Sequence, residues 1–315
     1  VDLITIEIEH VDTAALKRLA EEGKIIHPAP EKLEIIQDKG LQKKFFTDNG
    51  LPTEEFWLFE NRKEIRQAVR EGVIRTPFVQ KQRLEGYDGR GVKMVSSDYD
   101  LEEILEGGSV IERKTNIEKE LSVVVARNQD GETAAYAPVE MDFHPEANLV
   151  EYIISPARIS PEVAQQAIDL AKSTIEALDI CGLLAVEMFL TKDGKLLINE
   201  VAPRPHNSGH HTIESCVTSQ FEQHIRAICN FPLGSTRQIQ PAVMVNILGE
   251  PGYKGPVIYQ NMNECLRMEG VHVHIYGKRQ TRPFRKMGHV TIVDDTMEKA
   301  MEKAKFVKNN LKATS

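Results

Sequence analysis

The sequence is poor in cysteine and in long apolar segments. Its four cysteines, Cys181, Cys216, Cys229 and Cys265, lie too far apart for a Cys-x-x-Cys metal or redox motif, and four in 315 residues do not make a disulfide framework. No apolar run approaches the roughly 20 residues that cross a bilayer, and no stretch reads as a signal peptide. We therefore expect a cytoplasmic protein without membrane contact.

Basic residues are too few for a general nucleic-acid-binding protein. Lysine and arginine together number 39 against 47 aspartate and glutamate residues, so the formal net charge is −8. Proteins that bind nucleic acid through its phosphates need an excess of cations. We therefore expect no nucleic-acid partner, and we expect any anion site to be a local cluster of basic side chains.

The remaining composition is that of a globular protein with one large or two to three modest domains. Residues 1–30 predict strand, helix and strand, like the end of an α/β unit. Two hairpins, around Asp130-Gly131 and Asp193-Gly194, predict antiparallel sheets. The segment 232–241 is the best candidate for a domain boundary. We expect three parts: a remnant of an N-terminal α/β domain at 1–33, a central domain at 34–235 with a lid subdomain at about 75–140, and a small α+β domain at 236–315.

The second hairpin predicts two glutamates opposite each other. With Asp193-Gly194 at the centre of the turn, Lys192 faces Lys195. Further along the same hairpin, Glu187 then faces Glu200. Facing like charges destabilise a sheet, and the apolar neighbours of Glu187 add a desolvation cost. A divalent cation would offset both, since Mg²⁺ takes one or two carboxylates together with water and substrate phosphates. The alternative is that both side chains point to solvent or share a proton.

A glycine-rich loop, Gly86-Tyr87-Asp88-Gly89-Arg90-Gly91, lies between two predicted strands. Because no helix follows it, the loop is neither a Walker A loop nor a dinucleotide fingerprint. Its three glycines free backbone N–H groups to approach an anion, and Lys81 upstream adds a positive charge suited to phosphate. A plain turn is the alternative interpretation.

Two further segments could recognise anions. In 199–210, two prolines exclude helix and ladder and fix Arg204, His206 and Asn207 on a stiff loop beside the candidate metal strand. In 278–286, five of nine residues are cations, and arginine suits bidentate contact with carboxylate or phosphate. The alternatives are a structured loop with satisfied polar groups for the first segment and a solvated face for the second.

These features together resemble the N5-carboxyaminoimidazole ribonucleotide synthetase family of ATP-grasp enzymes. The resemblance is carried by QDK at 37–39, QKKF at 42–45, EGYDGRG at 85–91, NEVAPRPHNSGHHTIESC at 199–216, TSQFEQHIRAI at 218–228, HIYGK at 274–278 and RKMGHV at 285–290. It implies an α/β (α+β) ATP-grasp fold. A partial Rossmann-like N-terminal unit would precede a two-lobed ATP-grasp domain with antiparallel sheets and a small C-terminal α+β domain.

The resemblance also implies an activity, which is ATP-dependent carboxylation in purine (IMP) biosynthesis. Bicarbonate attacks the γ-phosphate of ATP to give carboxyphosphate, which delivers CO₂ to the exocyclic amine of 5-aminoimidazole ribonucleotide, with release of ADP and phosphate. The implied cofactors are ATP and Mg²⁺, with Mn²⁺ as an alternative metal. The implied partners are these small molecules, a second copy in a homodimer, and the mutase that receives the product.

Site residues follow from the resemblance position by position. It implies that Glu187 and Glu200 hold the metal and that Asp88 accepts from the substrate amine. The bicarbonate and substrate residues are expected to be Arg204, His206, Asn207, Lys278 and Arg285, of which Arg204, Lys278 and Arg285, with Asp88, form the catalytic set. The residues that contact ATP are expected to be Lys39, Lys81, Gly86, Tyr87, Asp88, Gly89, Arg90, Gly91, Glu112, Arg113, Lys114, Thr115, Glu120, His144, Asn199 and Glu200.

One departure from the family pattern stands out. The family begins with a strand and a glycine-rich turn that contacts the substrate phosphate, and this sequence starts after them, retaining Glu7, Glu9 and His10. Two other functions stay open at this point. One is another ATP-grasp ligase, such as the formate-dependent glycinamide ribonucleotide transformylase, and the other is a non-catalytic nucleotide-binding module.

Overall fold

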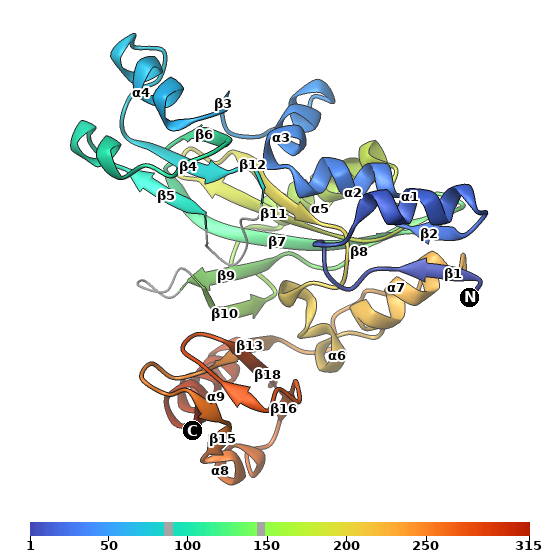
Figure 1. Cartoon of the computed structure of the whole chain (residues 1–315). Coiled ribbons are helices and arrows are strands. Elements are labelled where there is room, and N and C mark those ends of the chain that lie inside the picture. Colours follow the sequence, from blue (N-terminus) through green and yellow to red (C-terminus); the bar gives the residue numbers. More distant parts are fainter. Residues whose placement is uncertain (85–90, 144–148) are drawn as a thin grey trace.

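The computed structural model describes residues 1–84, 91–143 and 149–315 (Figure 1). At its N-terminal end two parallel strands, β1 (Leu3–Thr5) and β2 (Ile25–His27), are joined by helix α1 (Thr13–Glu21). The Asp12 carboxylate accepts a hydrogen bond from the Ala15 backbone N–H and so caps the start of α1. The predicted order of strand, helix and strand is confirmed.

Two consecutive helices, α2 (Pro30–Gln37) and α3 (Lys39–Asp48), lead from this unit to the first large lobe. Asp38 separates them. Its carboxylate accepts hydrogen bonds from the backbone N–H groups of Gly40 at 2.7 Å and Leu41 at 3.2 Å, and it also pairs with Arg83. This cap fixes where α3 starts, and therefore where the lysines of its first two turns point.

The first lobe is a four-stranded antiparallel sheet in the order β3-β6-β4-β5. Helix α4 (Arg62–Arg70) and a 3₁₀ helix (Asp98–Glu103) accompany it, and its core contains Ile65, Phe78 and Ile111. The strands are β3 (Phe56–Phe59), β4 (Phe78–Gln82), β5 (Val92–Val95) and β6 (Ser109–Arg113).

The second lobe belongs to a nine-stranded sheet whose order is β12-β11-β7-β9-β10-β13-β18-β16, with β8 paired to β7. Both faces of its centre are covered. Along β7, Val123 and Val125 pack toward helix α5 (Pro161–Leu178), whereas Val124 and Ala126 pack toward helix α7 (Gln220–Ile228). The strands of this lobe are β7 (Ile117–Arg127), β8 (Thr133–Ala135), β9 (Val139–Phe143), β10 (Val150–Ser155), β11 (Gly182–Thr191) and β12 (Leu196–Ala202).

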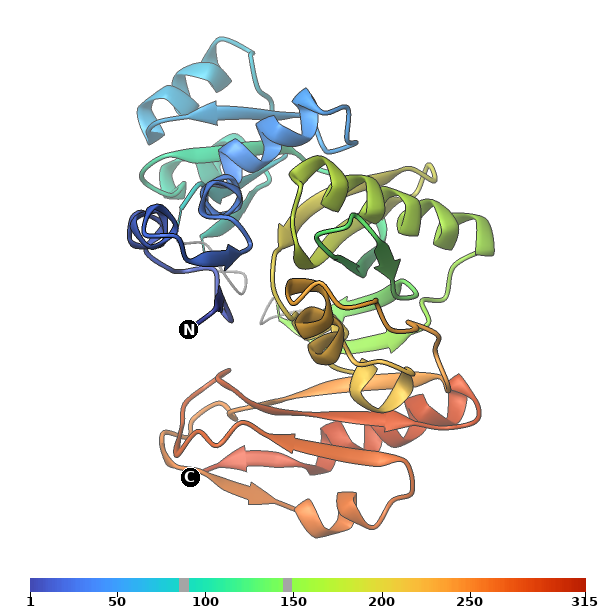
Figure 2. The same ribbon diagram turned by 90° about the vertical axis from the view of Figure 1, so that its right-hand side faces the viewer.

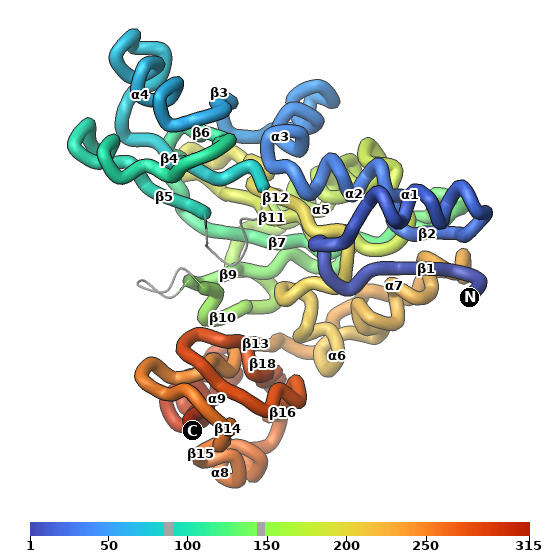
Figure 3. Tube along the Cα trace, viewed as in Figure 1, coloured from blue at the N-terminus to red at the C-terminus, as the bar shows by residue number. Residues whose placement is uncertain are grey.

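The C-terminal strands continue the same sheet. β13 (Ala242–Leu248) pairs antiparallel with β10 on one side and with β18 (Lys286–Val293) on the other, and β16 (Val271–Ile275) follows (Figure 2). Helix α9 (Met297–Asn310) packs on these strands through Ala300, Ala304 and Val307. The smaller elements of this part are α8 (Met262–Leu266), β14 (Gly255–Pro256) and β15 (Ile258–Gln260), which Figure 3 labels, together with β17 (Gln280–Thr281) and β19 (Lys312–Thr314).

The fold agrees with the expected combination of an α/β start, antiparallel sheets and a C-terminal α+β part. The range expected for a lid, about 75–140, contains strands of both sheets, since β4 to β6 lie in the small sheet and β7 and β8 in the large one. The domain limits remain predictions. Within the described ranges, no helix combines the length and the apolar character needed to span a membrane.

Candidate active site

The two glutamates of the second hairpin face each other. Glu187 on β11 is paired with Glu200 on β12, as predicted. The expected register at the turn is wrong, because the backbone N–H of Thr191, and not that of Lys192, donates to the Lys195 carbonyl. A bulge at Asn199 adds one residue to β12 and restores the predicted pairing.

The two carboxylates have opposite electrostatic surroundings. Burial, together with the negative charges of Glu200 and Glu120, raises the pKa of Glu187. Burial would also raise the pKa of Glu200, but the ammonium groups of Lys39 and Lys81 outweigh it and lower that pKa. Lys39, at the first turn of α3, forms an ion pair with Glu200.

A divalent cation fits this arrangement. Two facing carboxylates supply the hard oxygen ligands that Mg²⁺ prefers, and its remaining positions are usually filled by water and phosphate. A cation would also relieve the repulsion that raises the pKa of Glu187. Across 1–84, 91–143 and 149–315, no cluster of three or more His, Cys, Asp or Glu side chains is arranged to hold a metal without such additional ligands.

The glutamate pair lines a cavity of about 480 Å³. Its walls come from the N-terminal unit, α2 and α3, the large sheet and the C-terminal strands. The polar and charged side chains around it are Glu7, Glu9, His10, Gln37, Lys39, Gln42, Arg83, Glu187, Glu200, Arg204, His206, Asn207, Ser208 and Lys286. Groups expected to bind nucleotide, metal and substrate therefore meet in one place.

Lys81 is held in a buried network beside the glutamates. Its ammonium donates to Asn199 Oδ1 at 2.7 Å and pairs with Glu112 Oε2, also at 2.7 Å. Lys43 on α3 pairs with the other oxygen of Glu112 at 2.9 Å. Because of the two lysines, the pKa of Glu112 falls to about 2 although burial alone would raise it. Lys43 was not predicted as a site residue, and its only signal is its place in the QKKF string.

The predicted adenine segment lies at the end of β6. The Glu112 carboxylate is committed to the two lysines, whereas Arg113 forms an exposed ion pair with Glu55 and Thr115 donates to Glu54 at 2.6 Å. Lys114 is exposed. The backbone of this segment, not its side chains, is what the family resemblance assigns to adenine.

Glu120, the expected ribose-binding acid, lies on β7 between Met141 of β9 and Phe189 of β11. Burial, with a smaller contribution from Glu200, raises the pKa of Glu120 to about 7, against the opposing effect of Lys81. A carboxyl with such a pKa can present either an acceptor or a donor to a sugar hydroxyl at neutral pH.

The loop after β12 is braced from two sides. The Gln220 amide accepts from the His206 backbone N–H at 2.9 Å and donates to the His206 carbonyl at 2.8 Å. The Asn207 amide donates to Asn246 Oδ1 at 2.9 Å and accepts from Asn246 Nδ2 at 3.0 Å. Asn246 lies on β13, so the loop is tied to the C-terminal strands. Asn207 was expected to contact substrate, and part of its hydrogen-bonding capacity is used in this pair.

His206 is neutral in this setting. Burial, followed by the charges of Arg204 and Lys286, lowers the pKa of His206 to about 3. Its Nδ1 accepts from the Ser208 backbone N–H at 3.3 Å, which leaves Nε2–H directed to Glu187 Oε1 at 3.4 Å. Arg204 forms an ion pair of 2.8 Å with Glu9 of the N-terminal unit.

The basic segment 278–286 contributes one residue that was not predicted. Lys286 lines the cavity, whereas Lys278 and Arg285 are not among its described lining residues. The Lys278 ammonium donates to the Lys286 carbonyl at 2.7 Å, and Arg285 donates to the Gln280 carbonyl at 2.7 Å. Both cations thus hold their own loop in shape. Their roles toward substrate remain predictions.

Part of the expected site lies outside the described residues. This applies to Gly86, Tyr87, Asp88, Gly89 and Arg90 of the glycine-rich loop and to His144. Gly91 is described, and its carbonyl accepts a hydrogen bond from the Gln82 backbone N–H at 2.8 Å. Its φ of 71° is a conformation that favours glycine.

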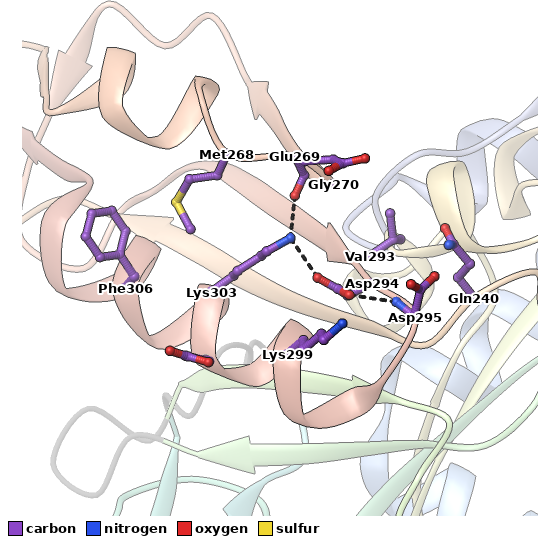
Figure 4. Close-up of a pocket in the computed structure, with 11 residues that line it drawn as sticks. Gln240, Met268, Glu269, Gly270, Val293, Asp294, Asp295, Lys299, Lys303 and Phe306 are labelled. Atoms are coloured by element: carbon purple, nitrogen blue, oxygen red, sulfur yellow. Dashed lines mark hydrogen bonds and ion pairs between the residues drawn. The ribbon is translucent and has the colours of Figure 1, made fainter.

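A second cavity, of about 590 Å³, lies in the C-terminal part (Figure 4). Lys303 on α9 crosses it and satisfies its charge by donating to Asp294 Oδ2 at 2.6 Å and to the Glu269 carbonyl at 2.7 Å. None of the predicted site residues that the structure describes lines this cavity. We therefore place the candidate active site at the glutamate pair.

Comparisons with known proteins identify the family of the chain. The family described as ATP-grasp domain matches residues 44–221, and the phosphoribosylaminoimidazole carboxylase C-terminal domain family matches residues 242–303. The chain is 39% identical over 296 residues to N5-carboxyaminoimidazole ribonucleotide synthase of Bacillus subtilis, covering 93% of this chain and 75% of that protein. It is 38% identical over 319 residues to phosphoribosylaminoimidazole carboxylase of Candida glabrata, covering 97% of this chain and 55% of that longer protein.

Solved structures of the same enzyme family superimpose on the chain. N5-carboxyaminoimidazole ribonucleotide synthetase of Thermotoga maritima superimposes with a TM-score of 0.90 at 49% identity, covering 100% of this chain and 82% of that one. The Aspergillus clavatus enzyme, in complex with ADP and 5-aminoimidazole ribonucleotide, superimposes with a TM-score of 0.86 at 31% identity, covering 98% of this chain and 82% of that one.

Proposed function

Because the chain belongs to the N5-carboxyaminoimidazole ribonucleotide synthase family of ATP-grasp enzymes, we propose that it carboxylates 5-aminoimidazole ribonucleotide with ATP and bicarbonate. One observation carries the proposal at the level of residues. The facing pair Glu187 and Glu200 lines the same cavity as Arg204, His206 and Lys286. With the proposed roles of these residues, a metal-nucleotide site would adjoin an anion site, as transfer of phosphate to bicarbonate requires.

The nucleotide end of the site contains Lys39, Lys81, Glu120 and the metal-binding pair. Phosphoryl transfer depends mainly on positioning and on neutralising the charge of the phosphates. Lys81 and Lys39 would supply fixed positive charge there, and Glu120 would bind ribose. Mg²⁺ held by Glu187 and Glu200 would neutralise the phosphate oxygens further.

The acceptor end of the site would bind bicarbonate and the aminoimidazole through Arg204, His206 and Lys286, with Lys278 and Arg285 as the family resemblance suggests. A bicarbonate oxygen attacks the γ-phosphorus while the bond from that phosphorus to the ADP oxygen breaks, giving carboxyphosphate. Cleavage of carboxyphosphate yields CO₂ and phosphate. The substrate amine then bonds to CO₂ and loses one proton. The role of Asp88 as acceptor of that proton stays a proposal from the resemblance.

The proposal is tested by measuring ADP release in the presence of Mg²⁺ and bicarbonate, with and without 5-aminoimidazole ribonucleotide. We expect strong stimulation by the aminoimidazole and formation of one carbamate per ADP. ADP release that is not stimulated by this substrate but is stimulated by another acyl acceptor would favour a different ATP-grasp ligase. Nucleotide binding without turnover would favour a non-catalytic module.

A comparison of two neighbouring cations refines the acceptor end of the site. Arg285→Ala should lower carboxylation more than it lowers ATP affinity, if Arg285 meets the substrate as the resemblance implies. Lys286→Met is the matched comparison, because Lys286 lines the cavity directly. Equal loss of nucleotide affinity and carboxylation in Arg285→Ala would instead assign that residue to the nucleotide site.

We further propose that the protein acts in the cytoplasm as a homodimer and passes its product to a mutase. The product is an N-carboxylated amine, which loses CO₂ readily in water, so prompt consumption by the next enzyme would preserve it. Sedimentation equilibrium over a range of protein concentrations tests the dimer, and a coupled assay that traps the product tests the transfer.

A further inference from the structure

Lys43 is an unusually buried lysine. Its side chain is 4% exposed, and it projects from α3 between the two lobes. Its ammonium group forms an ion pair with Glu112 Oε1 at 2.9 Å and donates hydrogen bonds to Thr53 Oγ1 at 2.7 Å and to the Ile198 carbonyl at 3.3 Å. Taking a lysine out of water costs free energy unless an opposite charge and hydrogen-bond acceptors compensate for it, and these three groups do so for Lys43.

Lys43 and Lys81 are linked to each other by two sets of contacts. Lys43 binds one oxygen of Glu112 and Lys81 binds the other. Lys81 also donates to Asn199, whose neighbour Ile198 gives its carbonyl to Lys43. Both lysines therefore contact the bulge of β12, which sets the pairing of the next residue, Glu200.

Sharing of Glu112 determines how much positive charge Lys81 keeps. With Lys43 in place, one carboxylate is divided between two ammonium groups, so the charge of Lys81 is only partly neutralised. Without Lys43, Glu112 would be compensated by Lys81 alone and would hold it more tightly. Lys81 would then be less available to an anionic ligand beside the glutamate pair.

We infer that Lys43 is a positioning residue of the nucleotide site, acting through Glu112 on Lys81 and through Ile198 on the bulge beside Glu200. The inference rests on the proposed role of Lys81 at the nucleotide phosphates. Lys43 itself touches no ligand in this account. Its effect is to leave Lys81 charged, oriented and incompletely paired.

The test measures nucleotide affinity by titration calorimetry with ADP and Mg²⁺, which needs no turnover. Lys43→Met keeps the length of the side chain and removes the charge, and we expect about tenfold weaker ADP binding. Affinity for 5-aminoimidazole ribonucleotide should change by less than about twofold. Thr53→Val, which removes one hydrogen bond to Lys43 and keeps all charges, should weaken ADP binding by about threefold and guards against the first variant failing to fold. The matched control is Lys303→Met, which breaks a lysine–carboxylate pair with Asp294 in the C-terminal part and should leave ADP affinity unchanged.

A double-mutant cycle tests whether Lys43 acts through Glu112. In the background of Glu112→Gln, Lys43→Met should cause less than about twofold further loss of ADP affinity. Full additivity of the two substitutions would overturn the inference, as would wild-type ADP affinity in folded Lys43→Met, or equal loss for both substrates. Absence of aminoimidazole-stimulated ADP release in the unaltered protein would count against the proposed function alone, since ADP binding and the cycle can still be measured.

Discussion

Replacing Glu112 by Gln should cost the protein a large part of its stability at neutral pH. Gln has the shape of a protonated glutamate, so the substitution imitates neutralising the carboxylate. The pKa of Glu112 is about 2 against an ordinary value of 4.5, and about 1.4 kcal/mol per pKa unit makes the ionised form worth about 3 kcal/mol. Two buried lysines that lose their shared counter-charge add to this cost.

The pH dependence of that difference has a defined sign. A carboxyl whose pKa is depressed in the folded state stabilises the protein above its unfolded pKa, and this contribution is lost as the pH falls toward the folded pKa. The difference in free energy of unfolding between the wild type and Glu112→Gln should therefore be greatest near pH 7. At pH 4 it should be smaller by roughly 1 kcal/mol.

Urea unfolding followed by circular dichroism at pH 7 and pH 4 measures both quantities. Glu55→Gln is the control, because Glu55 pairs with Arg113 at the surface, where such pairs contribute under about 1 kcal/mol. A gap below about 1 kcal/mol at pH 7, or an equal gap at both pH values, would refute the argument that the two lysines keep Glu112 ionised.

Three further outcomes follow from the site. Glu187→Gln or Glu200→Gln should nearly abolish ADP release, and retained turnover in a variant would exclude the replaced residue as an essential metal ligand. Without Mg²⁺, Glu187→Gln should be at least as stable as the wild type by thermal unfolding at pH 8, because the substitution removes a carboxylate with a raised pKa. Asn246→Leu removes the reciprocal amide pair with Asn207 and should destabilise the protein by about 2 kcal/mol in urea and lower carboxylation; unchanged values in both assays would contradict the bracing role. Because the pKa of His206 is about 3, the ratio of kcat/KM between the wild type and His206→Gln should stay constant from pH 5.5 to 8, and an inflection near pH 6.5 would show that His206 titrates there.

The sequence predicts the pairing of the two glutamates correctly although it predicts the register of the turn wrongly. The Asp-Gly turn signal is local and correctly indicates a hairpin, but the true turn is one residue out of the expected register. The bulge at Asn199 compensates. It is held from outside the hairpin, because the backbone N–H of Ile198 donates to the Pro52 carbonyl at 2.7 Å and Thr53 bridges to the same strand. No pattern within the hairpin contains that information.

Contacts with partners distant in the sequence were missed for the same reason. Lys43 lies in a polar helix with Gln42 before it and Lys44 after it, so the sequence gives no sign that Glu112 and Ile198 surround it. Asn207 reads as a free ligand on a stiff loop until Asn246 arrives from a C-terminal strand. Motif strings identify such positions as important, whereas only the tertiary structure shows which other residues they contact.

The pairing of β10 with β13 has a consequence for how the molecule can be divided. Four residue pairs, from Tyr152↔Val245 to Ser155↔Ala242, join the central lobe to the C-terminal strands through main-chain hydrogen bonds. The C-terminal family match begins at residue 242, on the first of these paired residues. Without the part that begins there, β10 would become an edge strand, and its unpaired amide and carbonyl groups would promote association with other chains. The two segments match separate families in sequence, but we do not expect either one to stay soluble without the other.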